Sequence, residues 1–515
     1  MERMAHIAND PHQPAPEPLG AHESDAGRVG VVDIGSNSVR LVVFNSASRV
    51  PLPLFNEKVL CGLGRGLDES GELNKDGVAL ALETLSRFAA LARAMKVRRL
   101  DFLATAAVRD ARNGPAFVRD AEGRIGQSIN VLSGAEEARL SAQGVLSGMP
   151  QATGAMGDLG GGSLEIAALA DGQQSTWATL PLGPLRLINQ EDGDRDKIAA
   201  RIDAALDGVE WLPTLAGKVF YPVGGAWRAL ARVQMQQSGY PLHMIHGYTL
   251  SAKEADEMLR MVASVGRRSL SRFADVSKRR LETLPYAALL LQRLIQRAKP
   301  ARLVFSAFGL REGWIYDGLD RDTRSQDPLI SAATVWAADD ARFPELGPLF
   351  RDWTRPLFPT KSLAEERLRH AVCLLSDVGW RYHPDYRAEQ MMLRVLRAQE
   401  LCVEHAERAF IALSLQARYG SDDSSGIGGA VTERLLPPRW ARAAELLGRT
   451  LRLGYVMSGG SQDMIRNTRL ELTERAVRLF LPRDAAVPPG QVMERRLEAL
   501  AQAAGRSESS LVRPD

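Results

Sequence analysis

Residues 33–38 read Asp33-Ile34-Gly35-Ser36-Asn37-Ser38, and residues 158–163 read Asp158-Leu159-Gly160-Gly161-Gly162-Ser163. The two stretches share Asp, Gly and Ser at the same offsets, and each lies between two short apolar runs. This pattern predicts a strand, a tight turn and a second strand. We therefore expect two copies of one strand–turn–strand unit, and the rest of the chain is interpreted around them.

The glycine-rich turns are typical of phosphate binding. Backbone N–H groups of successive glycines form a concave nest for phosphate oxygens, and Ser and Asn side chains add donors. Asp33, at the end of the first strand, can hold a divalent cation, because Mg²⁺ prefers carboxylate and phosphate oxygens. Two such turns facing each other would bind a chain of phosphates from both sides. Ordinary hairpin turns are the alternative, and the matched copies favour phosphate binding.

Length, composition and cysteine usage restrict the class of protein. The 515 residues predict two to four domains, and 45% hydrophobic with 25% charged residues is typical of a soluble globular chain. The sequence contains no apolar run of about 18 residues, so we expect no membrane span. We also expect no secretory signal. Cys61, Cys373 and Cys402 are widely spaced, which favours free thiols in the cytoplasm. A net charge of +3 gives no reason to expect nucleic acid.

Two further stretches supply candidate side chains. Residues 105–113 follow a short apolar strand, which lets Arg109 reach into a cleft, and its planar guanidinium suits phosphate. A surface salt bridge is the commoner role of a single arginine. Glu136 and Glu137 fall in the first turn of an expected helix. The helix dipole explains one of them, and the other is then available to accept a proton from an attacking water.

A basic segment lies further along the chain. Between residues 260 and 280, seven Lys and Arg residues accompany a single Asp. A solvated helix face explains such a run, and a polyanion contact is an equal alternative beside a phosphate site. The candidates for that contact are Arg267, Arg268, Lys278, Arg279 and Arg280.

The sequence pattern divides the chain into five segments. Residues 1–27 are rich in Pro and lack an apolar pattern, which predicts a disordered tail. Residues 28–140 and 141–317 alternate strand and helix patterns, and each contains one glycine-rich turn. Helical periodicity dominates residues 326–505, and the polar residues 506–515 are expected to form a loose tail.

Six motifs in order carry a family resemblance. They occupy residues 31–41, 104–113, 132–144, 157–166, 223–231 and 305–313. With this order and spacing the chain resembles the exopolyphosphatase and guanosine pentaphosphate phosphohydrolase family, within the actin-like, sugar-kinase-like ATPase superfamily. The resemblance implies an α/β protein with two actin-like, ribonuclease-H-like lobes and a phosphate cleft between them. An all-α, HD-like C-terminal domain follows.

The resemblance also implies roles for individual residues. The phosphate-binding loops would be formed by Gly35, Ser36, Asn37, Ser38, Gly160, Gly161, Gly162 and Ser163. Glu137 matches the base that activates water, Arg109 the phosphate-binding arginine, and Glu165 an acid that helps to place the metal. The expected cofactor is Mg²⁺ or another divalent cation, with Asp33, Asp158 and Glu165 as its ligands. A homodimer is expected from the resemblance alone.

The HD-like segment departs from the HD pattern. Ser376 stands where an HD metal site has His, and Asp377 alone does not make a metal pair. We therefore expect a degenerate, non-catalytic helical module, which serves dimerisation or the binding of long substrates.

The expected function is that of an exopolyphosphatase, which hydrolyses the terminal phosphoanhydride bonds of inorganic polyphosphate and releases orthophosphate. The first alternative is the hydrolysis of guanosine pentaphosphate to the tetraphosphate, and the basic segment favours the longer polyanion. The second is a phosphate or nucleotide sensor without turnover. Glu137 argues against a sensor, because binding alone needs no base. A kinase running in reverse would need firm nucleotide binding, for which only Gly224-Gly225 gives a signal.

Overall fold

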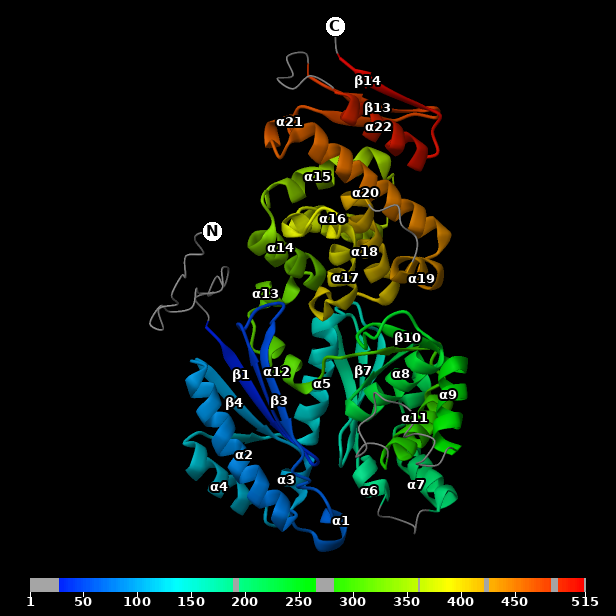
Figure 1. The fold of residues 1–515 in the computed structure, drawn as a ribbon. Coiled ribbons are helices and arrows are strands. Elements are labelled where there is room, and N and C mark those ends of the chain that lie inside the picture. Colours follow the sequence, from blue (N-terminus) through cyan, green and yellow to red (C-terminus); the bar gives the residue numbers. More distant parts are fainter. Residues whose placement is uncertain are drawn as a thin grey trace, which may run out of the picture.

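The computed structural model describes residues 27–188, 194–264, 282–359, 362–420, 426–482 and 490–513. Two α/β lobes lie side by side, and a helical domain sits across one end of the pair (Figure 1). This arrangement confirms the expected fold class. The tail predicted over residues 1–27 lies outside the described residues, apart from Gly27. In the part of the chain that is described, no helix is both long and apolar enough to cross a membrane.

The first lobe is built on a five-stranded sheet in the order β3-β2-β1-β4-β5. Its strands are β1 (Val29–Ile34), β2 (Val39–Phe44), β3 (Pro53–Val59), β4 (Arg99–Ala104) and β5 (Ile129–Val131). The first three are antiparallel neighbours, and β4 and β5 continue the sheet in parallel. The lobe's helices are α1 (Leu67–Ser70), α2 (Lys75–Ala94), α3 (Ala106–Asp110) and α4 (Gly114–Ile125). Leu85 and Phe88 of α2 are fully buried in one core with the sheet, as the helical spacing of apolar residues predicts.

The second lobe repeats this topology in a six-stranded sheet of order β10-β11-β9-β6-β7-β8. Its strands are β6 (Gly154–Leu159), β7 (Leu164–Ala170), β8 (Gln173–Leu180), β9 (Val219–Val223), β10 (Tyr248–Ser251) and β11 (Arg302–Phe305). The antiparallel β6, β7 and β8 correspond to β1, β2 and β3, and β9 is parallel to β6 as β4 is to β1. Its helices are α6 (Pro184–Ile188), α7 (Arg195–Asp207), α8 (Gly225–Gln237), α9 (Ala252–Ser264) and α11 (Leu284–Ala298). The two lobes therefore share one core topology.

Two helices, α5 (Gly134–Gly148) and α12 (Leu310–Asp317), cross between the lobes. Their backbones touch: a Cβ atom on Gly313 would lie 1.8 Å from the carbonyl oxygen of Leu140, and one on Gly144 would lie 2.2 Å from that of Gly309. The boundary expected between residues 140 and 141 is therefore wrong, because it falls inside α5. That helix follows β5 of the first lobe and packs against β7 and β8 of the second.

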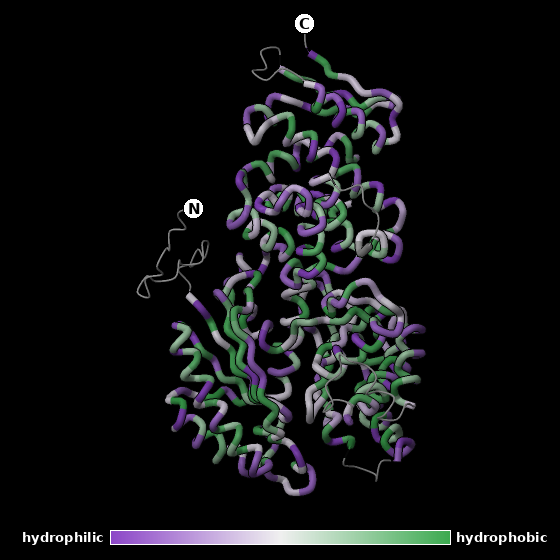
Figure 2. The backbone as a smooth tube through the Cα atoms, in the orientation of Figure 1, coloured by the Kyte–Doolittle hydropathy of each residue, from purple (hydrophilic) through white to green (hydrophobic). Residues whose placement is uncertain are grey.

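The C-terminal domain is mostly helical, with the hydrophobic cluster around Phe350 and Trp353 at its core. Its helices are α13 (Arg321–Ser325), α14 (Pro328–Asp340), α15 (Leu346–Thr354), α16 (Leu363–Leu375), α17 (Arg387–Arg397), α18 (His405–Tyr419), α19 (Gly426–Leu435), α20 (Pro438–Ser458), α21 (Gln462–Arg466) and α22 (Gln491–Ala503). Figure 2 shows hydrophobic segments inside the lobes and helical domain, with hydrophilic segments predominating around them.

A small sheet at the end of the chain corrects two expectations. Strands β12 (Arg469–Leu472), β13 (Ala476–Phe480) and β14 (Glu508–Val512) form it, in that order. The domain is therefore not all-α, and half of the tail expected to be loose, residues 508–512, is a strand paired in parallel with β13. The reason is that Leu511, opposite Leu479, packs on the domain's hydrophobic core. Such short strands with mixed polar residues give little periodicity to detect.

Candidate active site

The two glycine-rich turns lie on one cavity of about 220 Å³. Both are closed by the same hydrogen bond: Gly35 N donates to Ser38 O, and Gly160 N donates to Ser163 O, each at 3.0 Å. A Cβ atom on Gly161 would lie 3.2 Å from the Cβ of Ser36, so the turns of the two lobes approach each other closely. All eight loop residues proposed from the sequence line this cavity.

The structure separates the two acids at the start of α5. Glu136 belongs to the helix cap: its Oε2 accepts hydrogen bonds from the backbone N (2.8 Å) and the hydroxyl (2.7 Å) of Ser133. Glu137 is 7% exposed and lines the cavity. The capping box accounts for Glu136, and Glu137 is the acid available for chemistry.

Arg109 contacts Glu137 and does not lie on the cavity wall. Its Nη1 donates a hydrogen bond to Oε1 of Glu137 and another to Leu132 O at 3.0 Å, and its Nε pairs with Asp110 at 3.1 Å. The residues that line the cavity do not include Arg109. In this structure the guanidinium of Arg109 forms an ion pair with Glu137, and the phosphate contact expected for Arg109 stays a prediction.

Four carboxyl groups at the cavity have pKa values above their usual range. The pKa of Glu137 is raised to about 7, chiefly by burial and also by the charges of Asp158 and Asp33, against the lowering effect of Arg109. Burial and then the charge of Glu137 raise the pKa of Glu165 well above its ordinary value. Its Oε1 is buried and has no hydrogen-bond partner. Burial also raises the pKa of Asp33. It raises the pKa of Asp158 as well, although Ser141 donates a 2.6 Å hydrogen bond to Asp158.

Strand register shows how the two copies of the unit differ. Asp33 on β1 lies opposite Arg40 on β2, and Asp158 on β6 lies opposite Glu165 on β7. The same position therefore carries a cation in the first copy and an acid in the second. Sequence comparison of the turns alone did not single out Arg40.

Four basic residues, here named the cationic wall, line one part of the cavity: Arg40, Lys58, Arg228 and Arg311. Burial and then the charges of Arg311 and Arg228 lower the pKa of Arg40 to about 10. Arg311 lies 3.5 Å from Asp33, and its Nε is buried without a hydrogen-bond partner. The same four side chains line a second cavity of about 500 Å³, which extends to Gln399, Glu400 and Cys402 of the helical domain. An anion in either cavity would relieve the repulsion among these cations.

Residues 41–322 match the Ppx/GppA phosphatase family, and residues 314–512 match the exopolyphosphatase C-terminal domain. This chain belongs to the Ppx/GppA phosphatase family. Its curated relatives include retrograde regulation protein 2 of Saccharomyces cerevisiae, 25% identical over 433 residues, which is 76% of this chain and 73% of that protein. Exopolyphosphatase 1 of Mycobacterium tuberculosis is 26% identical over 320 residues, covering 60% of this chain and 92% of that protein. A crystal structure of an exopolyphosphatase from Cytophaga hutchinsonii shares the fold, with a TM-score of 0.52 and 23% identity over 57% of this chain and 99% of that one.

The proposed metal ligands of this Ppx/GppA chain, Asp33, Asp158 and Glu165, all line the cavity. Among the described residues, no three acids or other metal-binding side chains form a group that could hold an ion by themselves. The buried, unpartnered Oε1 of Glu165 and the raised carboxyl pKa values still fit a nearby cation. Mg²⁺ usually keeps several waters and binds one or two carboxylates together with substrate phosphate. The residues present therefore fit an ion shared with the substrate.

A third loop completes the cavity of the Ppx/GppA fold. Gly224 has a φ of +102°, and a Cβ atom there would lie 2.4 Å from Leu159 O and 3.1 Å from Oδ1 of Asp158. Both the left-handed backbone and the close approach require glycine. The loop thus supports Asp158, while the proposed polyanion contacts Arg267, Arg268, Lys278, Arg279 and Arg280 lie outside the described residues.

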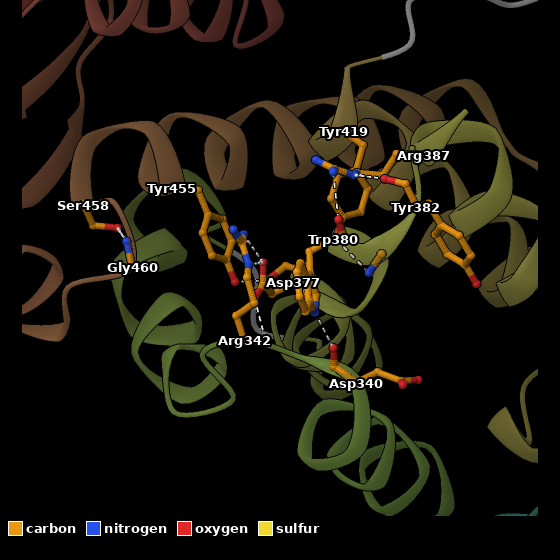
Figure 3. A network of polar contacts seen from close by, with 12 residues as sticks. Asp340, Arg342, Asp377, Trp380, Tyr382, Arg387, Tyr419, Tyr455, Ser458 and Gly460 are labelled. Carbon is orange, nitrogen blue, oxygen red and sulfur yellow. Dashed lines mark hydrogen bonds and ion pairs between the residues drawn. The ribbon is translucent and has the colours of Figure 1, made fainter. Parts of the chain in front are cut away.

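The acid expected at the degenerate HD position is used in an ion pair (Figure 3). Asp377 is 1% exposed and accepts hydrogen bonds from the backbone N of Arg342 at 2.9 Å and from its Nη2 at 2.6 Å. Ser376 Oγ lies 3.0 Å from the hydroxyl of Tyr455. The guanidinium therefore supplies the positive charge next to this carboxylate, as a metal does in an HD site.

Proposed function

We propose that this chain is an exopolyphosphatase, which hydrolyses terminal phosphoanhydride bonds of inorganic polyphosphate and releases orthophosphate. The observation that carries the proposal is the meeting of two phosphate loops from different lobes on one cavity that also contains Glu137. Membership of the Ppx/GppA phosphatase family and relatives named exopolyphosphatase support it.

In the proposed reaction, Glu137 acts as the general base. It accepts a proton from a water that attacks the terminal phosphorus in line, and the phosphoanhydride oxygen leaves with the shortened chain. A carboxyl group with a pKa near 7 is a much stronger base than an ordinary carboxylate and still ionises near neutral pH. Arg109 holds Glu137 in place and thus acts as a positioning residue.

Backbone N–H groups of the two turns would stabilise the phosphoryl oxygens, on which charge is spread during transfer. A divalent cation, when bound, would supply further neutralising charge on those oxygens. Asp33, Asp158 and Glu165 are the residues proposed to hold it. The gain in rate from the chain itself then comes from positioning and from preorganised charge.

The second cavity supports a long polyanion as the substrate. It shares the cationic wall with the first cavity, so a chain of phosphates can extend from one into the other without leaving basic side chains. Arg49 also lines the second cavity; it is 5% exposed, and its Nη2 has no hydrogen-bond partner. A polyanion held by many such contacts should bind more weakly as salt rises.

Two alternatives are retained. Guanosine pentaphosphate also carries a terminal phosphoanhydride and is smaller than a long polyphosphate. A sensor without turnover is supported by the yeast relative, whose name describes regulation. A homodimer and a cytoplasmic location remain predictions.

The decisive experiment measures orthophosphate release, with Mg²⁺, from long-chain polyphosphate and from guanosine pentaphosphate in parallel. Wild type, Glu137→Gln and the neighbouring Glu136→Gln are compared, and polyphosphate binding is measured for each. Release from polyphosphate that is lost only in Glu137→Gln, while binding persists, would support the proposal. Turnover of the nucleotide alone would favour the first alternative, and binding without turnover would favour the sensor.

A further inference from the structure

A third depression, here named the linker groove, has a volume of about 780 Å³ and shares no lining residue with the catalytic cavity. Three segments form it: the outward residues of α5, the first half of strand β8, and helices α12 and α13, which lead to the helical domain. Its principal side chains are Arg139, Gln174, Trp177, Tyr316, Arg321 and Arg324. The proposed function assigns nothing to this groove.

Trp177 presents an aromatic ring on an exposed edge of the second sheet. The residue is 47% exposed, and β8 is the last strand of its sheet. Trp side chains are rarely left exposed in a groove without a contact, because burying an indole gives a large gain. A flat ring of this kind stacks well on a nucleic acid base.

The charges of the linker groove are not balanced within the protein. The side chains of Arg321 and Arg324 form no ion pair or hydrogen bond in the described part of the chain, whereas Arg139 pairs with Asp317 at 2.6 Å. Glu136 is the one carboxylate among the lining residues, and it is bound to the cap of α5. Unpaired guanidinium groups suit phosphate oxygens, which they contact through two parallel N–H bonds.

One polar atom in the groove is also unsatisfied. Oε1 of Gln174 is buried and has no hydrogen-bond partner. Gln174 lies three residues before Trp177 on β8. A buried acceptor of this kind usually finds a donor. The exocyclic amino group of a base stacked on Trp177 would provide one.

We propose that the linker groove binds a nucleoside polyphosphate, with its base on Trp177 and its phosphates on Arg321 and Arg324. The ligand would contact α5, the helix that carries Glu137, and α13, which connects the lobes to the helical domain. Binding in the groove would therefore contact both the helix that carries Glu137 and the connection to the helical domain. The proposal does not depend on the phosphohydrolase assignment, because it is tested by binding.

The test uses the full chain and isothermal titration with ATP, adenosine, tripolyphosphate and a poly-glutamate peptide. We expect ATP to bind more tightly than tripolyphosphate, because base stacking adds to the phosphate contacts. Trp177→Ala should weaken ATP binding about tenfold, and Trp177→Phe, which keeps a ring, much less. Arg321→Ala with Arg324→Ala should weaken ATP binding at least tenfold, whereas tripolyphosphate should keep the site proposed for it in the catalytic cavity.

The control pair Arg119→Ala and Arg124→Ala, on the exposed side of α4, should bind ATP like wild type. Orthophosphate release from polyphosphate without nucleotide should be unchanged in all groove variants. ATP binding that none of the groove substitutions weakens would place the nucleotide elsewhere and overturn the proposal. Equal affinity for ATP, tripolyphosphate and the acidic peptide would also overturn it, since the groove would then be a general anion surface.

Discussion

Arg109 and Glu137 form an ion pair that joins the first lobe to helix α5. Arg109 lies on α3, just after strand β4, and Glu137 lies in the first turn of α5. Arg109 thus supplies the counter-charge of the buried acid and is not among the residues that line the cavity. Burial raises the pKa of Glu137 and Arg109 lowers it. The effect of burial is larger, so the pKa lies above its ordinary value.

The first prediction concerns the two adjacent acids of α5. Glu137→Gln should lower kcat for phosphate release by about 10²–10⁴, because an amide cannot accept the proton from water. Glu136→Gln, in the capping box, should retain kcat and lose at most about 1 kcal/mol of stability. Steady-state phosphate release and thermal unfolding check the pair. Equal kcat values for the two variants would remove Glu137 from the role of base.

The second prediction concerns the pH dependence of the rate. The ionised form of Glu137 is the active base, so kcat/KM should fall as the pH drops through about 7. Arg109→Ala removes the charge that lowers the pKa of Glu137. The inflection should therefore move to higher pH, and the rate should fall. A pH–rate profile of wild type and Arg109→Ala measures both. An inflection near pH 4.5 in both proteins would contradict the environment described for Glu137.

The third prediction concerns stability and pH. The pKa of Glu137 is higher in the folded protein, at about 7, than the ordinary 4.5. The folded state therefore holds this proton more tightly, and the associated stability, complete below pH 4.5, is lost as the pH rises to 7. The loss at pH 8 is on the order of 3 kcal/mol. Glu137→Gln should thus raise the melting temperature more at pH 8 than at pH 5. An equal change in melting temperature at both pH values would contradict the raised pKa of Glu137.

The fourth prediction concerns the crossing of α5 and α12. Gly313→Ala should destabilise the protein strongly, because its Cβ would lie 1.8 Å from a backbone oxygen that cannot move without shifting α5. Gly123→Ala is the matched control: this helical glycine has no heavy atom within 4 Å of a Cβ, and the change should stabilise α4 by about 0.5–1 kcal/mol. Thermal unfolding of both variants is the measurement. A neutral Gly313→Ala would mean that the two backbones are not in contact.

The fifth prediction concerns the ion pair in the helical domain. Asp377→Asn should cost about 1–3 kcal/mol, because it weakens a buried, charge-assisted contact with Arg342. Phosphate release should stay within twofold of wild type. Asp385→Asn, at a side chain that is 80% exposed, should change neither quantity. A large loss of turnover in Asp377→Asn alone, at a temperature where it is folded, would give this domain a direct part in the reaction.

Sequence reasoning located the features that are local in the chain. Each glycine-rich turn and its two flanking strands occupy one short stretch, residues 29–44 or 154–170, and the acid pair of α5 is a single dipeptide. The spacing within each stretch carries the signal. The cationic wall could not be found in this way, because Arg40, Lys58, Arg228 and Arg311 come from distant segments that only the fold brings together.

The carboxylate partner of Arg109 could not be predicted for a related reason. Its position after a strand was visible, but its partner, Glu137, lies 28 residues away, and only the fold brings the two side chains together. The short strand β14 was missed because a four- or five-residue strand in polar sequence has no distinct period. The boundary between the lobes could not be predicted from the sequence, because the single helix α5 follows the first lobe and packs against the second.

Arg40 and Glu165 occupy the same position in the two similar strand–turn–strand units. Two equal halves would give a symmetric cleft, in which a phosphate chain could lie equally well in either direction. Here one half carries a cation opposite its aspartate, and the other half carries an acid there. The two sides of the cleft therefore differ in charge: a cation lies opposite the aspartate on one side, and an acid lies opposite it on the other. In the proposed reaction, this difference would distinguish the part of the cleft that holds the terminal phosphate from the part along which the rest of the chain extends.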